Sequence, residues 1–269
     1  MIRPLLAALV LCMPAANAAE NLDAAPIGTA VTGSFELGGR LIPLPEGTFQ
    51  LAARSINEPA MLEGSIAIPR AKIAHVILVD IKPPRLRAAV HARVALKPQY
   101  YRGFHWLGQP CRKDDTLYRA DLTGSHGEDE NCLLVDHSIR NFSPRGQGIW
   151  KDAADWLTAQ KVELPVPVLI TAHVTRFQKT QLVGASYAFN PRMYGCNAPI
   201  SRSYADSPWH KNAVNADPQR ARFVESVTAW GKLVQTDFDA LVAGKPSSVE
   251  NAPPIYNCAA GQVALGQAP

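Results

Sequence analysis

The chain has 269 residues and a formal net charge of +4 at pH 7. A chain of this length buries a sizeable core by itself, as one domain or as a large domain with an appendage. The positive charge is small and evenly spread, which argues against a nucleic-acid-binding protein. The sequence contains no internal repeat and no low-complexity tract.

Residues 1–18 have the features of a secretory signal peptide. Arg3 supplies the positive start, residues 5–13 the apolar core, and Ala16-Asn17-Ala18 a small-x-small cleavage site. The apolar run is too short for a permanent membrane anchor, and no later segment is long and apolar enough to cross a bilayer. We therefore expect cleavage after Ala18, with an uncleaved anchor as the alternative. The mature chain is then periplasmic or secreted and has no transmembrane segment.

The N-terminal part of the mature chain is predicted to form strands. Residues 29–37 are rich in β-branched and aromatic side chains, and Gly38-Gly39 suits a two-residue hairpin turn. Return strands over residues 41–44 and 48–54 would complete an antiparallel meander.

Two further strands follow. The apolar run at residues 73–81 predicts a central strand. Residues 86–96 alternate between apolar and polar side chains, which predicts a half-buried strand. Its polar side, with Arg87, His91 and Arg93, is assigned to the solvent surface.

The middle of the chain is less regular. Short strands are expected at residues 116–122 and 132–135, and an amphipathic helix at residues 147–161. Residues 168–177 and 182–189 then predict a β-hairpin.

The clearest pattern is a long amphipathic helix over residues 217–244. Asp217 and Pro218 mark its start and Gly244 its end. Its apolar stripe consists of Phe223, Val227, Trp230, Val234, Phe238 and Leu241. The order of elements predicts an α+β fold, in which an antiparallel β-sheet core carries the long C-terminal helix and one shorter mid-chain helix. We expect a single domain over residues 19–245 and a tail over residues 246–269 that is anchored by Cys258.

Four cysteines remain after the predicted cleavage: Cys111, Cys132, Cys196 and Cys258. An even number in an exported chain predicts two disulfides, and three pairings are possible. We favour Cys111–Cys132, which closes a compact polar excursion, and Cys196–Cys258, which ties down the tail. None of these cysteines has the close spacing of a zinc knuckle.

Two stretches resemble uncharacterised exported proteobacterial proteins. Residues 38–47, with the sequence GGRLIPLPEG, are similar to an N-terminal pattern of those proteins. Ser207-Pro208-Trp209-His210, followed by Asp217-Pro218 and Ala229-Trp230-Gly231, resembles their C-terminal helical region. The resemblance implies a Gram-negative periplasmic setting and implies no activity, cofactor or site residue.

The best candidate for a recognition surface is an aromatic cluster in the irregular middle segment. Aromatic rings interleaved with a cation suit the binding of a sugar, peptide or protein partner. The cluster consists of Tyr100, Tyr101, Arg102, Phe104 and Trp106. Core packing under a long loop is the alternative.

Candidate chemistry rests on histidines. His105, His126 and His137 flank or lie within the cysteine-bounded segment and would form a metal site if its strands fold back on one another. Exposed or hydrogen-bonded histidines are the alternative. His173 lies on a semi-polar strand face that is suited to line a pocket. Ser186 lacks the strand-to-helix context of a nucleophile elbow.

No catalytic constellation is recognisable, and no cofactor is predicted. The first hypothesis is therefore non-catalytic binding of a small ligand or an envelope protein partner, through the aromatic cluster. The second is a periplasmic hydrolase, with or without metal assistance, that uses the loop histidines.

Overall fold

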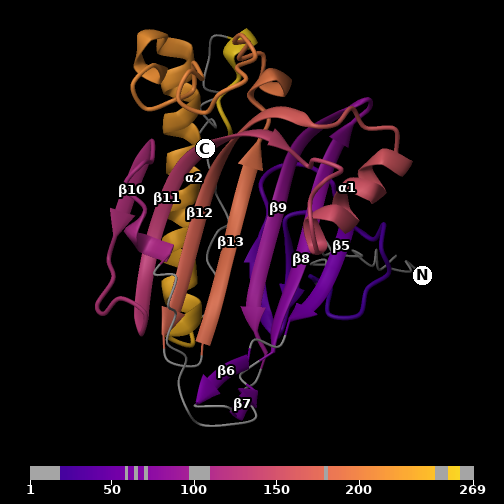
Figure 1. Cartoon of the computed structure of the whole chain (residues 1–269), viewed down its shortest axis with the longest axis vertical. Coiled ribbons are helices and arrows are strands. Elements are labelled where there is room, and N and C mark those ends of the chain that lie inside the picture. Colours follow the sequence, from indigo (N-terminus) through magenta and orange to yellow (C-terminus); the bar gives the residue numbers. More distant parts are fainter. Residues whose placement is uncertain are drawn as a thin grey trace, which may run out of the picture.

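The computed structural model describes residues 19–57, 60–63, 66–69, 72–96, 110–178, 181–245 and 254–260. The fold is α+β, with an eight-stranded antiparallel sheet, a three-stranded sheet and a two-stranded sheet. The main sheet has the strand order β10 (Tyr118–Asp121), β11 (Asp129–Asn141), β12 (Val166–Gln178), β13 (Gln181–Phe189), β9 (Arg85–Ala95), β8 (Ile73–Lys82), β5 (Phe49–Asn57) and β2 (Ala30–Val31). Figure 1 shows α2 (Pro218–Val242) and α1 (Ile149–Ala159) on opposite faces of this sheet.

The long C-terminal helix was predicted correctly. Helix α2 begins after Asp217, whose carboxylate accepts a hydrogen bond from the Gln219 backbone N–H at 2.9 Å. All six residues of the predicted stripe are buried, and the helix crosses β11, β12 and β13. A Cβ atom on Gly231 would lie 2.5 Å from Leu133 Cδ1, so this glycine allows the helix to approach the sheet closely. We call the side of the sheet that carries α2 the back face.

The small sheet covers the rest of the back face. It contains β1 (Glu20–Asn21), β3 (Ser34–Leu37) and β4 (Arg40–Pro43). The predicted hairpin at Gly38-Gly39 is confirmed, since both residues have positive φ and Leu37 pairs with Arg40. The Tyr187 hydroxyl on β13 donates to the Pro43 carbonyl at 3.0 Å and ties the two sheets together.

The predicted single meander is wrong. Residues 29–37 form two strands, β2 and β3, which belong to different sheets. Gly33 lies between them with a φ of +69°, a conformation that favours glycine. The chain therefore leaves the main sheet after Val31, and the apolar side chains of β3 and β4 pack over the back face instead of extending the sheet.

The front face of the sheet carries α1. This helix packs on β5 and β8 through Ala153, Ala154 and Leu157, which are fully buried. The mid-chain helix was expected at residues 147–161 and is confirmed. The remaining hairpin, β6 (Ala60–Glu63) and β7 (Ile66–Pro69), forms the two-stranded sheet.

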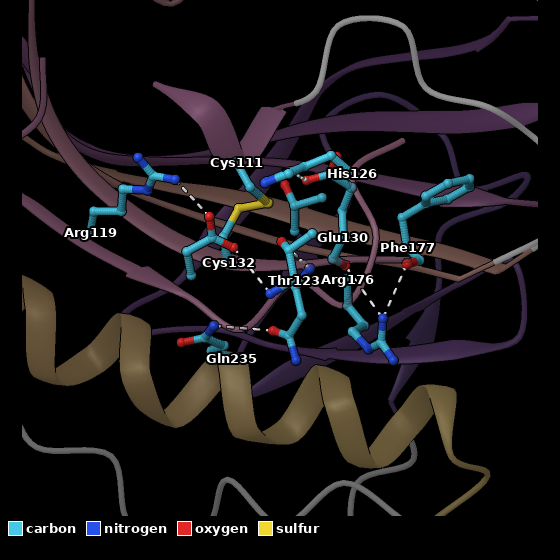
Figure 2. Close-up of a disulfide and its surroundings, with 12 residues drawn as sticks. Cys111, Arg119, Thr123, His126, Glu130, Cys132, Arg176, Phe177 and Gln235 are labelled. Atoms are coloured by element: carbon cyan, nitrogen blue, oxygen red, sulfur yellow. Dashed lines mark hydrogen bonds and ion pairs between the residues drawn. A yellow bond between two sulfur atoms is a disulfide. The ribbon is translucent and has the colours of Figure 1, made fainter. Parts of the chain in front are cut away.

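The disulfides have the favoured pairing, Cys111–Cys132 and Cys196–Cys258. The first joins the short 3₁₀ helix Pro110–Arg112 to β11, as Figure 2 shows. The second joins Cys196, which follows the 3₁₀ helix Pro191–Tyr194, to the last described segment, residues 254–260. Two disulfides are typical of proteins that fold in an oxidising compartment. Within the described ranges, no helix is long and apolar enough to span a membrane.

Candidate functional site

A cleft of about 580 Å³ lies on the front face of the main sheet. Its floor comes from the middle strands, its walls from the turn before α1 and the start of α1, and its rim from Lys113, His137 and Tyr204. We call it the front cleft. The floor consists of Ala89, His91, Asp136, Ser138, Leu169, Thr171, His173, Ser186 and Ala188, and the walls contain Phe142, Ser143, Gly146 and Trp150.

Strand register brings the polar floor residues together. His91 on β9 pairs with Ser186 on β13, and Ser186 pairs with His173 on β12. Paired residues of antiparallel strands point to the same face. Three polar side chains that are far apart in the sequence therefore form one row across the floor.

The histidines in this row are uncharged at neutral pH. Burial lowers the pKa of His173 to about 4. Burial, together with Arg93 and His75, lowers the pKa of His91 to about 3. The floor therefore presents neutral imidazoles, which are able to donate or accept hydrogen bonds without carrying charge.

Each of these imidazoles has one hydrogen-bond partner within the described part of the chain. His173 Nδ1 lies 2.8 Å from Ser186 Oγ, and His91 Nε2 lies 3.2 Å from His75 Nδ1. These bonds orient the two rings. They leave the second nitrogen of each ring without a partner among the described residues.

The charged groups where the floor meets the rim neutralise each other. Asp136 forms an ion pair with Lys113. Its carboxylate also accepts hydrogen bonds from the Tyr204 hydroxyl at 2.8 Å and from the His137 backbone N–H at 2.7 Å. Burial and the hydrogen bond to Asp136 raise the pKa of Tyr204, whereas burial lowers the pKa of His137. Asp136 is therefore fully engaged in holding the rim together.

The wall near α1 is aromatic. The Trp150 ring lies 5.1 Å from the His91 ring and 5.6 Å from the Phe142 ring, both in edge-to-face geometry. Trp150 remains 41% exposed despite these two ring contacts. Phe142 has a φ of +54°, a left-handed conformation that is uncommon for a bulky residue. The wall therefore combines an accessible indole with a strained backbone position, and such positions cluster at functional sites.

The predicted recognition surface is not tested by the structure. Tyr100, Tyr101, Arg102, Phe104 and Trp106 all lie outside the described residues, and so does His105.

The predicted metal site is not supported. His126 lies in the turn before β11, where its Nδ1 is 3.4 Å from Glu130 Oε2 (Figure 2). His137 stacks on Tyr204 near the other end of the same strand. Glu130 and His137 are seven positions apart on β11, which at about 3.3 Å per residue separates them by roughly 20 Å. His126 and His137 therefore cannot share one ion, and the described part of the chain contains no cluster of three potential metal ligands.

Sequence reasoning identified part of the front cleft. His173 was expected to line a pocket together with Thr171 and Thr175. His173 and Thr171 line the front cleft, whereas Thr175 does not and accepts a hydrogen bond from Arg93. His91 was assigned to the surface, but it lies half-buried on the cleft floor. Arg87 and Arg93 are also half-buried: Arg87 pairs with Asp80, and Arg93 donates to Thr175 Oγ1 at 3.1 Å. The alternating pattern placed His91 and Arg93 on one face, and nothing in it indicated that this face would be covered. Arg87 instead lies at a register shift between β8 and β9 and reaches Asp80, which pairs with the back-face residue Ala88.

Comparisons of the chain with protein-family models, with curated proteins and with solved structures give no significant match.

Proposed function

We propose that the protein binds a small organic molecule in the front cleft and does not transform it chemically. The volume of about 580 Å³ falls in the range of roughly 300–1,000 Å³ that is usual for small-molecule sites. Such sites combine apolar walls with a few oriented polar groups. The observation that carries the proposal is that Trp150 and Phe142 converge with His91, His173 and Ser186 on one cleft.

The geometry around Ser186 favours binding over catalysis. Strand β13 pairs with β12 on one side and with β9 on the other, so the backbone N–H groups near Ser186 are used in the sheet. They are not available as an oxyanion hole, which usually makes a large contribution to acyl transfer. Asp136 is bonded to Lys113, Tyr204 and the His137 backbone, so it does not orient the His173 ring as the acid of a triad would.

We further propose that this binding takes place in the periplasm of a Gram-negative cell. Both disulfides support an oxidising compartment. The signal-peptide pattern of residues 1–18 and the resemblance to exported proteobacterial proteins support export.

The binding proposal is tested by filling the cleft. Ala188→Trp places an indole on the floor, and Leu122→Trp adds the same side chain at a position that is 68% exposed and does not line the cleft. A library of small fragments is screened by thermal shift against the wild type and both variants. We expect fragments that stabilise the wild type and Leu122→Trp but not Ala188→Trp. Fragments that stabilise all three proteins equally would show that the front cleft is not the binding site.

A second candidate function is acyl-ester hydrolysis by Ser186 with His173 as the base. The 2.8 Å contact between Ser186 Oγ and His173 Nδ1 favours it, because a serine nucleophile needs an adjacent base. A fluorophosphonate probe separates the two functions. The binding proposal predicts no covalent adduct at Ser186, and an adduct that disappears in Ser186→Ala would establish the hydrolase.

A further inference from the structure

We propose that the front cleft selects an uncharged ligand that combines a flat apolar body with a hydrogen-bonding group. The inference rests on the proposed function and names the chemical class of its ligand. Three observations support the inference: the paired charges of the cleft, the free ring nitrogens of its floor and its aromatic wall.

The front cleft offers no uncompensated charge among its described lining residues. Lys113 and Asp136 are the ionised lining groups, and they pair with each other. Asp136 accepts two further hydrogen bonds, so a ligand would have to break existing contacts to use it. An ionised ligand group would therefore lose water without gaining a counter-charge, which is costly in a partly apolar site.

The polar floor supplies hydrogen bonds without charge. His91 and His173 are neutral, and each has one ring nitrogen without a protein partner in the described ranges. Ser186 Oγ lies between the two histidine positions in the same row. The free nitrogen of each neutral imidazole is a donor or an acceptor according to the tautomer, so a ligand carbonyl, hydroxyl or amine N–H is matched by these groups.

The walls favour a flat apolar body. Trp150 and Phe142 stand on one side, and Leu169, Ala89 and Ala188 provide apolar floor. Aromatic rings pack against other rings in offset or edge-to-face geometry. The exposed part of Trp150 is a surface of this kind, and a bicyclic or tricyclic ligand fits a volume of about 580 Å³.

Two dyes that differ by one charged group test the inference. N-phenyl-1-naphthylamine is uncharged, and 8-anilinonaphthalene-1-sulfonate has the same ring system with a sulfonate added. Fluorescence titration of each dye is carried out on the wild type and on Ala188→Trp. We expect the uncharged dye to bind the wild type at least about tenfold more tightly than the sulfonate, and Ala188→Trp to lose that binding.

A charge added to the wall provides a second measurement. Ser143 lines the cleft near Phe142. Ser143→Lys introduces a cation, and Ser143→Met introduces an uncharged side chain of similar length. We expect the lysine variant alone to bind the sulfonate dye about as tightly as the uncharged dye.

The outcomes separate the inference from the proposed function. Equal affinity of the wild type for both dyes, lost in Ala188→Trp, would keep the front cleft as a binding site and overturn the preference for uncharged ligands. Preference for the sulfonate would overturn it as well. Binding of neither dye, or binding that Ala188→Trp leaves unchanged, would overturn both proposals.

Discussion

The two faces of the main sheet are built from the same strands and serve different purposes. On the back face, α2 and the small sheet cover a continuous apolar layer that contains most of the largest buried side chains. On the front face, α1 covers β5 and β8, and the front cleft lies over β9, β13, β12 and the end of β11. Alternate residues of one strand therefore contribute to stability on one face and to a polar site on the other. The comparison predicts that substitutions on the back face change folding, whereas substitutions in the cleft change binding.

The largest effect is expected for Trp230→Ala. Trp230 is buried on the back face, with its ring 5.5 Å from that of Tyr187. Its truncation should lower the free energy of unfolding by about 3–5 kcal/mol, which is usual for a buried tryptophan. Urea denaturation measures this value. Leu233→Ala, on the exposed side of the same helix, is the control and should change stability by less than about 1 kcal/mol. Equal effects of the two variants would contradict the burial of the stripe.

The second prediction is that the free energy of unfolding decreases in acid because of the two cleft histidines. His91 and His173 have folded pKa values of about 3 and about 4, below the unfolded value of about 6.5. The unfolded chain therefore binds protons first, and stability falls as the pH decreases from about 6.5 towards 4. Each histidine contributes at most about 1.4 kcal/mol per pH unit in this window.

His91→Gln tests the origin of that slope. Glutamine does not titrate, so the variant should lose less stability than the wild type between pH 6.5 and 4, as measured by urea denaturation at each pH. His126→Gln, in the turn before β11, is the matched control. If the free energy of unfolding of His91→Gln depends on pH as steeply as that of the wild type, His91 does not cause the loss of stability in acid.

A smaller loss is expected for Gly231→Ala, at the close contact between α2 and the sheet. The added methyl meets Leu133 Cδ1 at 2.5 Å and Ala172 Cβ at 3.2 Å. Overpacking costs about 1–3 kcal/mol, and the higher helix propensity of alanine offsets up to about 1 kcal/mol of this cost. A net loss of about 1–2 kcal/mol should appear in urea denaturation.

A double-mutant cycle shows whether the contact is the cause. In a Leu133→Ala background the 2.5 Å contact is removed and only the milder one to Ala172 remains, so the cost of Gly231→Ala should shrink. If Gly231→Ala lowers the free energy of unfolding equally in both backgrounds, the contact with Leu133 is not the cause.

The smallest effect on folding is expected for Trp150→Ala in the front cleft. Because Trp150 is 41% exposed, its removal should change stability by about 1 kcal/mol or less. The affinity for N-phenyl-1-naphthylamine should fall about tenfold, because the ring contact is lost. Trp150→Phe should keep most of that affinity. A variant that unfolds as readily as Trp230→Ala would remove the distinction between the two faces.

Local patterns predicted many of the elements well. Helix α2, the Gly38-Gly39 turn and the β12–β13 hairpin depend on residues that are close in sequence, so their signals are complete within a short window. Strand β11 was underestimated. It was expected over residues 132–135 and extends over Asp129–Asn141, because its polar ends are held by pairing with β12. Neighbouring strands override the weak strand propensity of its polar residues.

The candidate site was harder to predict than the fold. The semi-polar face of β12 indicated that His173 lines a pocket, but the same kind of pattern on β9 assigned His91 to the surface. A strand pattern states which residues share a face and does not state what covers that face. The aromatic wall was missed because Trp150 was read only as part of an amphipathic helix.

By itself, the sequence determined the α+β class and the long closing helix with its buried stripe, and it favoured the observed disulfide pairing among three possible ones. These features follow from periodicity, from capping residues and from the number and placement of cysteines. Only the tertiary structure decided that His91, Ser186 and His173 stand in one row beside Trp150. Their alignment depends on the register between strands that are distant in the chain, and register is set by the packing of the whole sheet.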